Sequence, residues 1–407
     1  MNRTFVINYN RLLKVIGLCI ILFPFIQQRT YTEMNPVIGY FYRYASIAVS
    51  VIILLFAVNN RSYLKGKKYL YWMGLFCGLY ILPTVIYCRQ NLLYVVYHVV
   101  ALFSLMLYIS IEIEKNPREL MSALSFLYGM YIYLNLILWL LFPKGLYKTA
   151  SYHSAFLLGD DNAIIYVVLP GLICMVVNSL QKYNRIKLNV WIAAIASEVM
   201  LLYLWSASAM VVLFLFLFLV LAGIYFGKVK PIMMLIITSV IIVFFFVATN
   251  SPIIKDFVKP VLNKSSTFDS RIFFWSKSLE LIGTRPILGS GGYFQIGRWL
   301  INSYATQFYP CHTPYLQILI DGGIVLFASF VIITVVGFRT AQKYKSSFSV
   351  CILAAGLCCM MLNYITEYSE LYHFFIILTL MMNSHKFEVE EMKKRRLIKF
   401  KRIKSAF

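Results

Sequence analysis

The sequence predicts an all-α, polytopic integral membrane protein with about 12 transmembrane helices and one long loop outside the membrane. Its composition is the first reason, because 60% of the 407 residues are hydrophobic and only 13% are charged. With a mean hydropathy of +0.74, this composition is typical of a membrane protein and not of a soluble domain. The second reason is the length of the apolar runs, most of them close to the roughly 20 residues that a helix needs to cross a bilayer.

The apolar runs follow one another with mostly short, basic connections. The first, sixth and last runs are short, and the seventh and eighth form a tight hairpin around Trp205 and Ser206. Because FPFIQQ near the end of the first run offers no small-residue cleavage site, we expect a retained first helix and not a cleaved signal peptide. The predicted spans cover about residues 12–26, 37–58, 69–88, 92–111, 120–142, 163–179, 188–205, 207–226, 232–249, 315–337, 348–366 and 371–383.

The distribution of Lys and Arg predicts which side of the membrane each connection faces. If the N-terminus is cytoplasmic, 26 of the 38 cations fall in the inner connections and the two terminal segments. The long loop holds seven of the others, and long loops are largely exempt from the rule. Both termini are therefore expected in the cytoplasm, and the long loop outside.

Four regions follow: residues 1–249 with the first nine spans, the extracytoplasmic loop 250–314, residues 315–383 with the last three spans, and a basic cytoplasmic tail, 384–407. The loop carries seven cations against three anions. Its middle, residues 270–282, reads as an amphipathic helix that could lie flat at the membrane interface. Gly and Pro in residues 283–294 predict a sharp turn back to the membrane surface. The apolar face of the amphipathic helix is expected to contain Ile272, Trp275, Leu279 and Ile282.

The sequence lacks the motifs of several classes of protein. The glycine cluster of the loop has no preceding strand and no following GK[ST], so a nucleotide loop is not expected. The sequence contains no Walker loop, no zinc signature and no Cys/His metal set, so we expect no cofactor and no metal site built on such a set. The net charge of +22 lies largely in membrane-flanking segments, where anionic lipid head groups and not nucleic acid are the expected partner.

His312 is the leading candidate for chemistry. Thr313, Pro314 and a long apolar run follow it, and because proline fits the first helical turn, His312 is expected at the mouth of a helix. The positive end of the helix dipole favours neutral imidazole, the form that accepts a proton. The alternative is an interfacial histidine that bonds a neighbouring carbonyl.

Three arginines of the loop are candidates for binding an anion. A guanidinium group matches phosphate oxygens in a bidentate manner. The outer leaflet gives less electrostatic reason to collect cations than the inner one, so head-group anchoring alone does not account for them. The predicted phosphate-binding residues are Arg271, Arg285 and Arg298.

Acidic and amide side chains form a second group of candidates. Asp160, Asp161 and Asn162 close the other long external connection, where they could cap the next helix or hydrogen-bond sugar hydroxyls. Asp321 lies two turns into an apolar run, and Glu198 lies inside the seventh span. Intramembrane acids usually face a protein interior or a cavity, and we expect this of both.

Three motifs of this region together resemble the O-antigen ligase and polysaccharide polymerase superfamily. The resemblance covers residues 250–330 well, and it extends loosely over the chain through the number of spans and GDDNA at 159–163. The family usually has Asn after the histidine, whereas Thr313 stands here. The motifs are R-x-x-x-W (Arg271, Trp275), P-x-x-G-x-G (Pro286, Gly289, Gly291) and H-x-x-Y-L-Q-x-L-x-x-x-G-I (His312, Tyr315, Gly323, Ile324).

The resemblance implies a helical, GT-C-like enzyme that moves a glycan from undecaprenyl diphosphate to an acceptor, with inversion and without a nucleotide sugar. It implies that His312 is the general base and that Arg271 contacts the diphosphate. We place Tyr315 among the substrate-binding residues, together with the acids and amide at 160–162. Where the family often has a mid-chain Ser-Arg, this chain has Ser206-Ala207. Either Arg285 or Arg298 would supply that charge, or the subfamily manages without it.

The leading function hypothesis is a polymerase that joins lipid-linked repeat units into a surface polysaccharide, such as a capsule or exopolysaccharide, at the cytoplasmic membrane of a bacterium. Ligation of a finished glycan to another acceptor is an alternative with the same chemistry. A flippase of lipid-linked oligosaccharides is an alternative from another class, and it should show two related halves. The expected partners are the undecaprenyl-diphosphate-linked oligosaccharide and membrane lipids, with a chain-length regulator left open.

Overall fold

The computed structural model describes residues 9–26, 35–148, 154–226, 230–248, 265–294, 311–366 and 371–391. The predicted external loop and the predicted basic tail fall partly outside these residues. Arg298 is not among the described residues, and only 384–391 of the predicted tail are.

Helices form almost all of the described regular structure, and each predicted span coincides with one of them. Six helices (α3, α4, α5, α6, α7 and α14) are long and apolar enough to cross a membrane by length and composition, and α8, α9, α10, α15 and α16 are shorter apolar helices. The prediction of an all-α, polytopic membrane protein is therefore confirmed. In chain order the helices are α1 (Tyr9–Leu22), η1 (Phe23–Phe25), α3 (Pro36–Asn59), η2 (Arg61–Tyr63), α4 (Tyr69–Tyr87), η3 (Arg89–Asn91), α5 (Leu92–Lys115), α6 (Pro117–Leu141), α7 (Ile165–Tyr183), α8 (Leu188–Tyr203), α9 (Ala207–Phe226), α10 (Pro231–Ala248), α12 (Ser265–Thr284), α14 (Pro314–Lys343), α15 (Phe348–Asn363) and α16 (Tyr372–Met382).

The only strands in the described part of the chain form a two-residue hairpin in the connection between α6 and α7. Strands β1 (Tyr147–Lys148) and β2 (Ser154–Ala155) pair antiparallel. This hairpin adds no sheet to the core, so the fold rests on helix packing alone.

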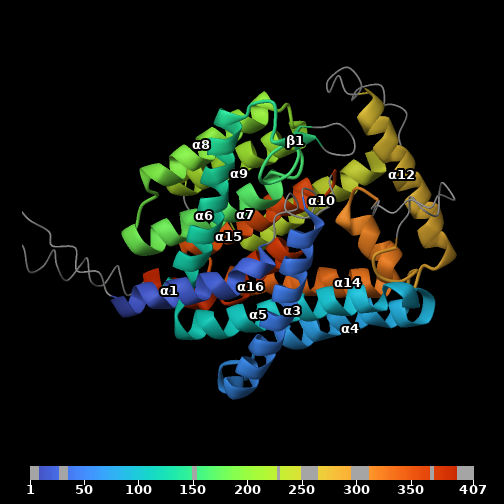
Figure 1. Cartoon of the computed structure of the whole chain (residues 1–407), viewed down its shortest axis with the longest axis horizontal. Helices are drawn as coiled ribbons and strands as arrows, with labels where there is room; N and C mark the ends of the chain where they lie inside the picture. Colours follow the sequence, from blue (N-terminus) through green and yellow to red (C-terminus); the bar gives the residue numbers. More distant parts are fainter. Residues whose placement is uncertain are drawn as a thin grey trace, which may run out of the picture.

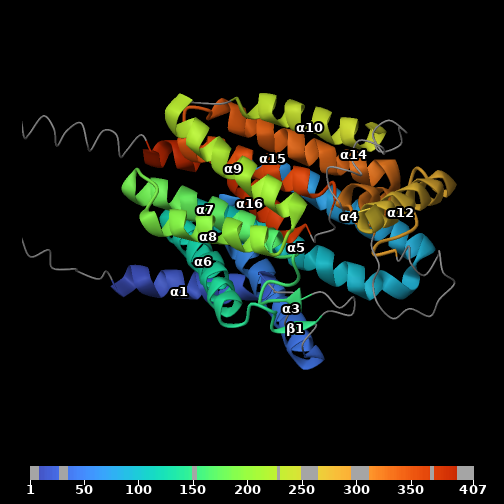
Figure 2. The same cartoon turned by 90° about the horizontal axis from the view of Figure 1, so that it is seen from above.

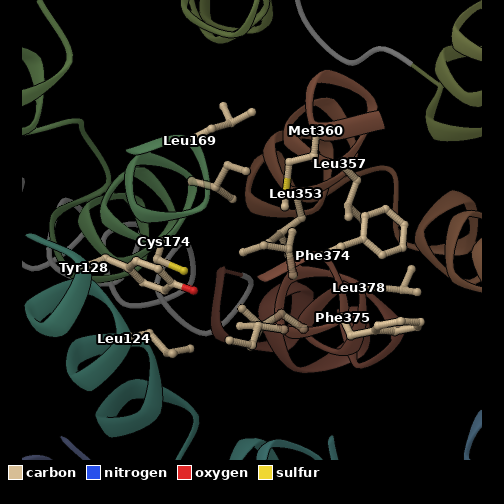
Figure 3. Packing of buried hydrophobic residues seen from close by; sticks show 14 of the residues in the cluster. Leu124, Tyr128, Leu169, Cys174, Leu353, Leu357, Met360, Phe374, Phe375 and Leu378 are labelled. Carbon is tan, nitrogen blue, oxygen red and sulfur yellow. The ribbon is translucent and has the colours of Figure 1, made fainter. Parts of the chain in front are cut away.

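The core lies where α6, α7, α15 and α16 meet, and Figure 3 shows side chains of these helices filling the space between them. Both α15 and α16 are apolar around most of their circumference, which is the pattern of a helix buried on all sides. Small residues allow close approach, because a Cβ added at Gly356 would lie 2.2 Å from the side chain of Ile173. By contrast, α3 and α10 leave many apolar side chains exposed, as lipid-facing helices do.

The two ends of the molecule differ in what they carry. The beginning of α1 lies far to the left in Figures 1 and 2, whereas α12, from the predicted loop, lies far to the right. The helical segment 384–391 docks on the first turn of α6, where Glu390 binds Arg118 at 2.5 Å. The same turn contacts α1, because Glu119 binds Arg11 at 3.0 Å. We call this the terminal end, and the opposite end, which carries α12, the loop end.

Charged side chains at the terminal end pair with one another. Glu114, at the C-terminal end of α5, contacts Lys67 at 2.9 Å, Lys386 at 2.5 Å and His385 at 3.2 Å. Glu391 accepts hydrogen bonds from the backbone N–H groups of Phe348 and Ser349, the first residues of α15. These contacts fasten the segment 384–391 to three different helices, and a carboxylate at a helix N-terminus is in addition favoured by the dipole.

Helix α14 is broken at Gly323, whose φ of 65° and ψ of −165° are not helical. Figure 1 shows α14 in orange as two segments that meet at an angle. The first segment, residues 314–322, lies at the loop end, and the second runs on through the bundle. Broken helices at membrane depth require other groups to satisfy their freed backbone, and a turn of the loop supplies them.

Candidate functional site

His312 sits immediately before α14 and is held by both of its neighbours. Thr313 is the N-cap residue of α14, and its hydroxyl donates to the carbonyl of Tyr364 at 2.6 Å. The backbone N–H of Cys311 donates to the side chain of Gln317 at 3.3 Å. Between these anchors His312 adopts a left-handed φ of 62°, which is uncommon for a residue other than glycine. The predicted place of His312 at the mouth of a helix is confirmed.

Helix α12 positions Arg271 at this histidine. Trp275, one turn after Arg271, is only 4% exposed and packs against Phe245 and Phe246 of α10 at ring distances of 6.0 and 5.5 Å. Residues four apart lie on the same face of a helix, so the tryptophan fixes the direction in which Arg271 projects. The ring of Phe274 on the same helix meets His312 edge to face at 5.4 Å. Trp275 of the R-x-x-x-W motif therefore anchors α12 against α10, and Arg271 lies near enough to His312 for its charge to act on the imidazole.

The face that α12 buries differs in part from the predicted one. Trp275 and Leu281 are buried and Ile282 is half-buried, but Leu279 is 50% exposed, and Ser278 is buried in its place. Ser278 fits there because its hydroxyl donates to the carbonyl of Phe274 at 2.7 Å. Trp275 contacts protein and not head groups, because α10 and the first segment of α14 form a hydrophobic pocket for it.

Electrostatics keep His312 neutral. Burial lowers the pKa of His312 from its ordinary 6.5 to about 4, and the positive charge of Arg271 lowers it further in the same direction. An imidazole with this pKa is unprotonated at neutral pH, so it can accept a proton. The site thus places a neutral base beside a cation, and these are the two kinds of group that can accept a proton and stabilise a negative charge.

The Gly-rich residues 286–293, which we call the glycine turn, fill the break in α14. The backbone N–H of Ile324 donates to the carbonyl of Pro286 at 2.8 Å, and that of Ser290 donates to the carbonyl of Ile320 at 2.6 Å. Glycine is required on both sides of this contact, since a Cβ at Gly289 or Gly323 would lie 2.6 Å or less from backbone atoms of the other segment. The turn is therefore packed against α14, and its expected return to the membrane surface stays a prediction.

Asp321 is the buried partner of this turn. One carboxylate oxygen accepts from the hydroxyl of Tyr80 at 2.5 Å, and the other accepts from the backbone N–H of Phe294 at 3.1 Å and the side chain of Gln317 at 2.8 Å. The expectation that this acid faces the protein interior is confirmed. Its partners give it a structural role, because they tie α4, the residue directly after the glycine turn and α14 together.

Arg285 lies apart from His312 in its contacts. Its guanidinium group stacks on the ring of Tyr87, at the C-terminal end of α4, with 4.2 Å to the ring centroid. The side chain is exposed, which leaves it accessible to an anion at the loop end. Arg298 lies outside the described residues, so its predicted role stays a prediction.

The external connection between α6 and α7, which ends in Asp160, Asp161 and Asn162, contacts the start of α9. The carboxylate of Asp160 accepts from the backbone N–H of Ala163 at 3.1 Å, which is a local capping contact. Asp161 accepts from the backbone N–H of Asn162. The side-chain oxygen of Asn162 accepts from the hydroxyl of Ser206 at 3.0 Å, immediately before α9. No direct contact joins these residues to His312 within the described part of the chain, and a role in binding sugars stays a prediction.

Tyr315 is buried beneath the site. Its hydroxyl donates to the carbonyl of Met361 at 2.7 Å, and its ring contacts Phe246. A small cavity of about 10 Å³ lies nearby between α7 and α15, lined among others by Tyr166, Asn363 and Tyr364. This volume suits one water molecule and not a sugar. The tyrosine therefore supports the N-terminal segment of α14 from below.

The structure thus brings His312 and Arg271 together and distributes the other candidates around them. Two contributing residues had no assigned role: Phe274, whose ring contacts the histidine, and Gln317, whose side chain bonds Cys311 and Asp321. Gln317 stood within the quoted H-x-x-Y-L-Q motif, so a signal for it existed. Among the described residues, no group of three His, Cys, Asp or Glu side chains could hold a metal ion.

Comparison with known proteins points to one family. The family model described as O-antigen ligase matches residues 188–331, the segment that runs from α8 through α12 to the middle of α14. None of the curated proteins compared with the chain matches it. The matched segment contains His312, Arg271, Trp275 and the glycine turn. The resemblance to the O-antigen ligase and polysaccharide polymerase superfamily is therefore confirmed over residues 188–331 of this integral membrane protein.

Proposed function

We propose that this protein is an inverting glycosyltransferase that polymerises undecaprenyl-diphosphate-linked repeat units into a surface polysaccharide. The observation that carries the proposal is the neutral imidazole of His312 beside Arg271, within the segment that matches the O-antigen ligase family. The base precedes α14 and the cation lies in α12. This arrangement is suited to act on the attacking group and the leaving group at the same time.

The reaction follows from these two residues. An imidazole nitrogen of His312 takes the proton of a sugar hydroxyl on the acceptor unit, and the oxygen attacks the anomeric carbon of the donor glycan. The bond from that carbon to the diphosphate oxygen breaks, with inversion, and undecaprenyl diphosphate leaves with the electron pair. The guanidinium of Arg271 stabilises the negative charge that grows on the leaving diphosphate. In this proposal Arg285 holds the lipid diphosphate near the membrane surface, and Asp160, Asp161 and Asn162 contact sugar hydroxyls.

The proposed location is the cytoplasmic membrane of a bacterium, with the loop end outside and the terminal end in the cytoplasm. The excess of Lys and Arg at the terminal end supports this orientation. A reporter that is active only in the cytoplasm, fused after Glu391, should be active, whereas the same reporter inserted at Asn263 should not. The reverse pattern would place the site on the wrong side for a lipid-linked glycan that has already been exported.

Two alternatives differ from polymerisation in the product. A ligase would transfer the glycan to an acceptor other than a second lipid-linked unit, and a flippase would move the lipid-linked unit across the membrane without changing it. An enzyme is favoured over a flippase because most of the basic residues expected on the external side lie in one asymmetric loop and the sequence has no two related halves.

The test is an elongation assay with the purified full-length protein in detergent. Lipid-linked repeat units isolated from producing cells are the only substrate, with no nucleotide added, and the products are separated as a ladder on a gel. A ladder with released undecaprenyl diphosphate is the expected result. If the protein only transfers the glycan to an added, different acceptor, it is a ligase. If the lipid-linked units stay unchanged in the assay, the protein is not this transferase.

A further inference from the structure

A cluster of tyrosines surrounds His98 at the loop end of α5. The imidazole lies 4.3 Å from the ring of Tyr94, 4.5 Å from that of Tyr97 and 5.0 Å from that of Tyr293, which belongs to the glycine turn. Arg43 of α3 lies over Tyr94, with 5.6 Å from its guanidinium carbon to the ring centroid. We call these five residues the tyrosine site. None of them has a role in the transfer step described above.

The tautomer of His98 can be assigned from its hydrogen bonds. The hydroxyl of Tyr372 donates its single proton to the backbone carbonyl of His98 at 3.0 Å. The hydroxyl oxygen of Tyr372 also lies 3.1 Å from Nδ1 of His98, and with its proton directed at the carbonyl we assign Nδ1 as the donor of this second bond. Nε2 therefore carries no proton and can only accept. It is buried, and no group among the described residues hydrogen-bonds to it. A buried acceptor without a donor is costly, and it indicates a ligand that supplies one.

Arg43 adds a cation that lacks a carboxylate. It lies two turns into a membrane helix, is exposed, and stacks on the rings of Tyr40 and Tyr94. None of the ion pairs found among the described residues involves it. An arginine at this depth needs an anion, and the phosphate of a lipid can reach it from the bilayer. Aromatic rings beside it offer faces on which a sugar can stack.

We infer that the tyrosine site binds the head group of a second lipid-linked saccharide, the acceptor, with its phosphate at Arg43 and a sugar hydroxyl donating to Nε2 of His98. This inference rests on the proposed function, which requires two such molecules at once. Binding requires the ring of Tyr94 to turn outward, since it covers the imidazole edge-on. Tyr94 is 37% exposed, and exposed side chains change rotamer rapidly.

The tyrosine site and His312 are joined by a short series of contacts. Tyr293 borders His98, and the next residue, Phe294, accepts a hydrogen bond from Gln317 through its carbonyl at 3.1 Å. Gln317 in turn accepts from the N–H of Cys311, next to His312. Residues 293 and 294 thus lie between the tyrosine site and the segment that carries the base. A saccharide held at Arg43 and His98 can extend its hydroxyl end past this stretch toward the base.

The same chemistry, a lipid phosphate with a hydroxyl-bearing head group, could come from phosphatidylglycerol, and the experiment separates the two sources. Native mass spectrometry counts the lipid-linked repeat units bound to the purified full-length protein, with and without phosphatidylglycerol at equal concentration. We expect two repeat units on the wild type. Arg43→Gln and His98→Leu should each raise the Kd of the second molecule about 10-fold or more while the first stays bound. Arg89→Gln is the matched control, an exposed cation at the same end whose Nε bonds the carbonyl of Val85, and it should still bind two.

Arg43 is exposed, so its replacement keeps the fold and the test does not depend on the buried His98 variant. The inference would be overturned if Arg43→Gln still bound two repeat units, or if phosphatidylglycerol displaced the second unit from the wild type. In both cases the proposed function would stand as long as the wild type elongates the repeat units. A single bound unit on an elongating wild type would also overturn it. A wild type that binds no repeat unit and makes no ladder would remove the proposed function and this inference together.

Discussion

The terminal end and the loop end of the molecule differ in how many ion pairs their cations form. At the terminal end, cations meet carboxylates: Lys67 and Lys386 both contact Glu114, and Arg118 contacts Glu390. At the loop end, Arg43 and Arg285 lie over tyrosine rings. Lys115 at the terminal end also lies over aromatic rings, so the two ends differ in their ion pairs and not in whether cations contact rings. Charges that neutralise each other hold segments together, whereas charges presented on aromatic rings stay available to an anion from outside the chain.

Within the loop end, α12 contains both kinds of cation on one helix. Lys277 pairs with Glu280 at 2.7 Å, three residues on, and the two side chains are 36% and 57% exposed. Arg271 lies one and a half turns earlier, and its charge acts on His312. A comparison of these two residues therefore separates a cation that serves the site from one that serves the helix surface.

The largest effect is expected from His312→Asn. Asparagine tolerates the left-handed backbone that residue 312 adopts, so the substitution removes the base and keeps the turn. Elongation of lipid-linked repeat units should fall by about 10²–10⁴-fold, the usual worth of a general base. His385→Asn is the control, since that histidine contacts Glu114 at the other end, and it should elongate normally. A full ladder from the His312→Asn protein at a near-normal rate would show that the histidine is structural.

The next effect compares the two cations of α12. Arg271→Ala should lower the elongation rate by about 10²–10³-fold, as the loss of one preorganised charge contact does elsewhere. Lys277→Ala should change it little, because an exposed pair three residues apart contributes only a few tenths of a kcal/mol. Initial rates at saturating substrate decide between them. Equal, small losses in both variants would mean that the basic loop is only a head-group anchor.

A smaller effect concerns pH. His312 works as a base only when it is neutral, so the rate should stay high down to about pH 5 and fall as the pH drops through its pKa of about 4. Arg271→Gln removes a charge that disfavours the imidazolium, so the acid limb of its residual activity should move to higher pH. Burial remains the larger cause, and the limb should therefore stay below 6.5. A wild-type limb at 6.5 or above would contradict a buried, neutral base. The measurement is kcat/KM against pH in both proteins.

Much of the architecture could be predicted from the sequence, because membrane spans are recognised by composition and length. Each predicted span coincides with a helix, including the short α8 and α9 that follow each other around Trp205. The place of His312 at a helix mouth followed from Pro314, since proline is compatible with the first helical turn but not with the interior. Both inferences rest on local chemistry, which a sequence displays directly.

The sequence could not predict what depends on contacts between distant segments. The break of α14 at Gly323 exists because the glycine turn packs against it there, and neither segment alone requires it. The burial of Ser278 in place of Leu279 has the same cause, because the side chains of α10 and α14 that contact α12 determine which of its residues is buried. Nor did the tyrosine site show in the sequence, because it gathers side chains from α3, α5 and the glycine turn, each unremarkable in its own surroundings.

The smallest effect tests the terminal end. Glu114→Gln removes the carboxylate that Lys67, Lys386 and His385 share, and its side chain is only 17% exposed. Because this side chain is neither fully exposed nor fully buried, we expect the substitution to lower the free energy of unfolding by about 1–3 kcal/mol. The Tm of the detergent-purified protein should fall accordingly. Because the loop end is untouched, the elongation rate below that temperature should equal that of the wild type. Glu280→Gln, which breaks the exposed pair on α12, is the matched control and should leave the Tm nearly unchanged. If Glu114→Gln instead slowed elongation with an unchanged Tm, the paired charges of the terminal end would take part in function, and the contrast between the two ends would no longer hold.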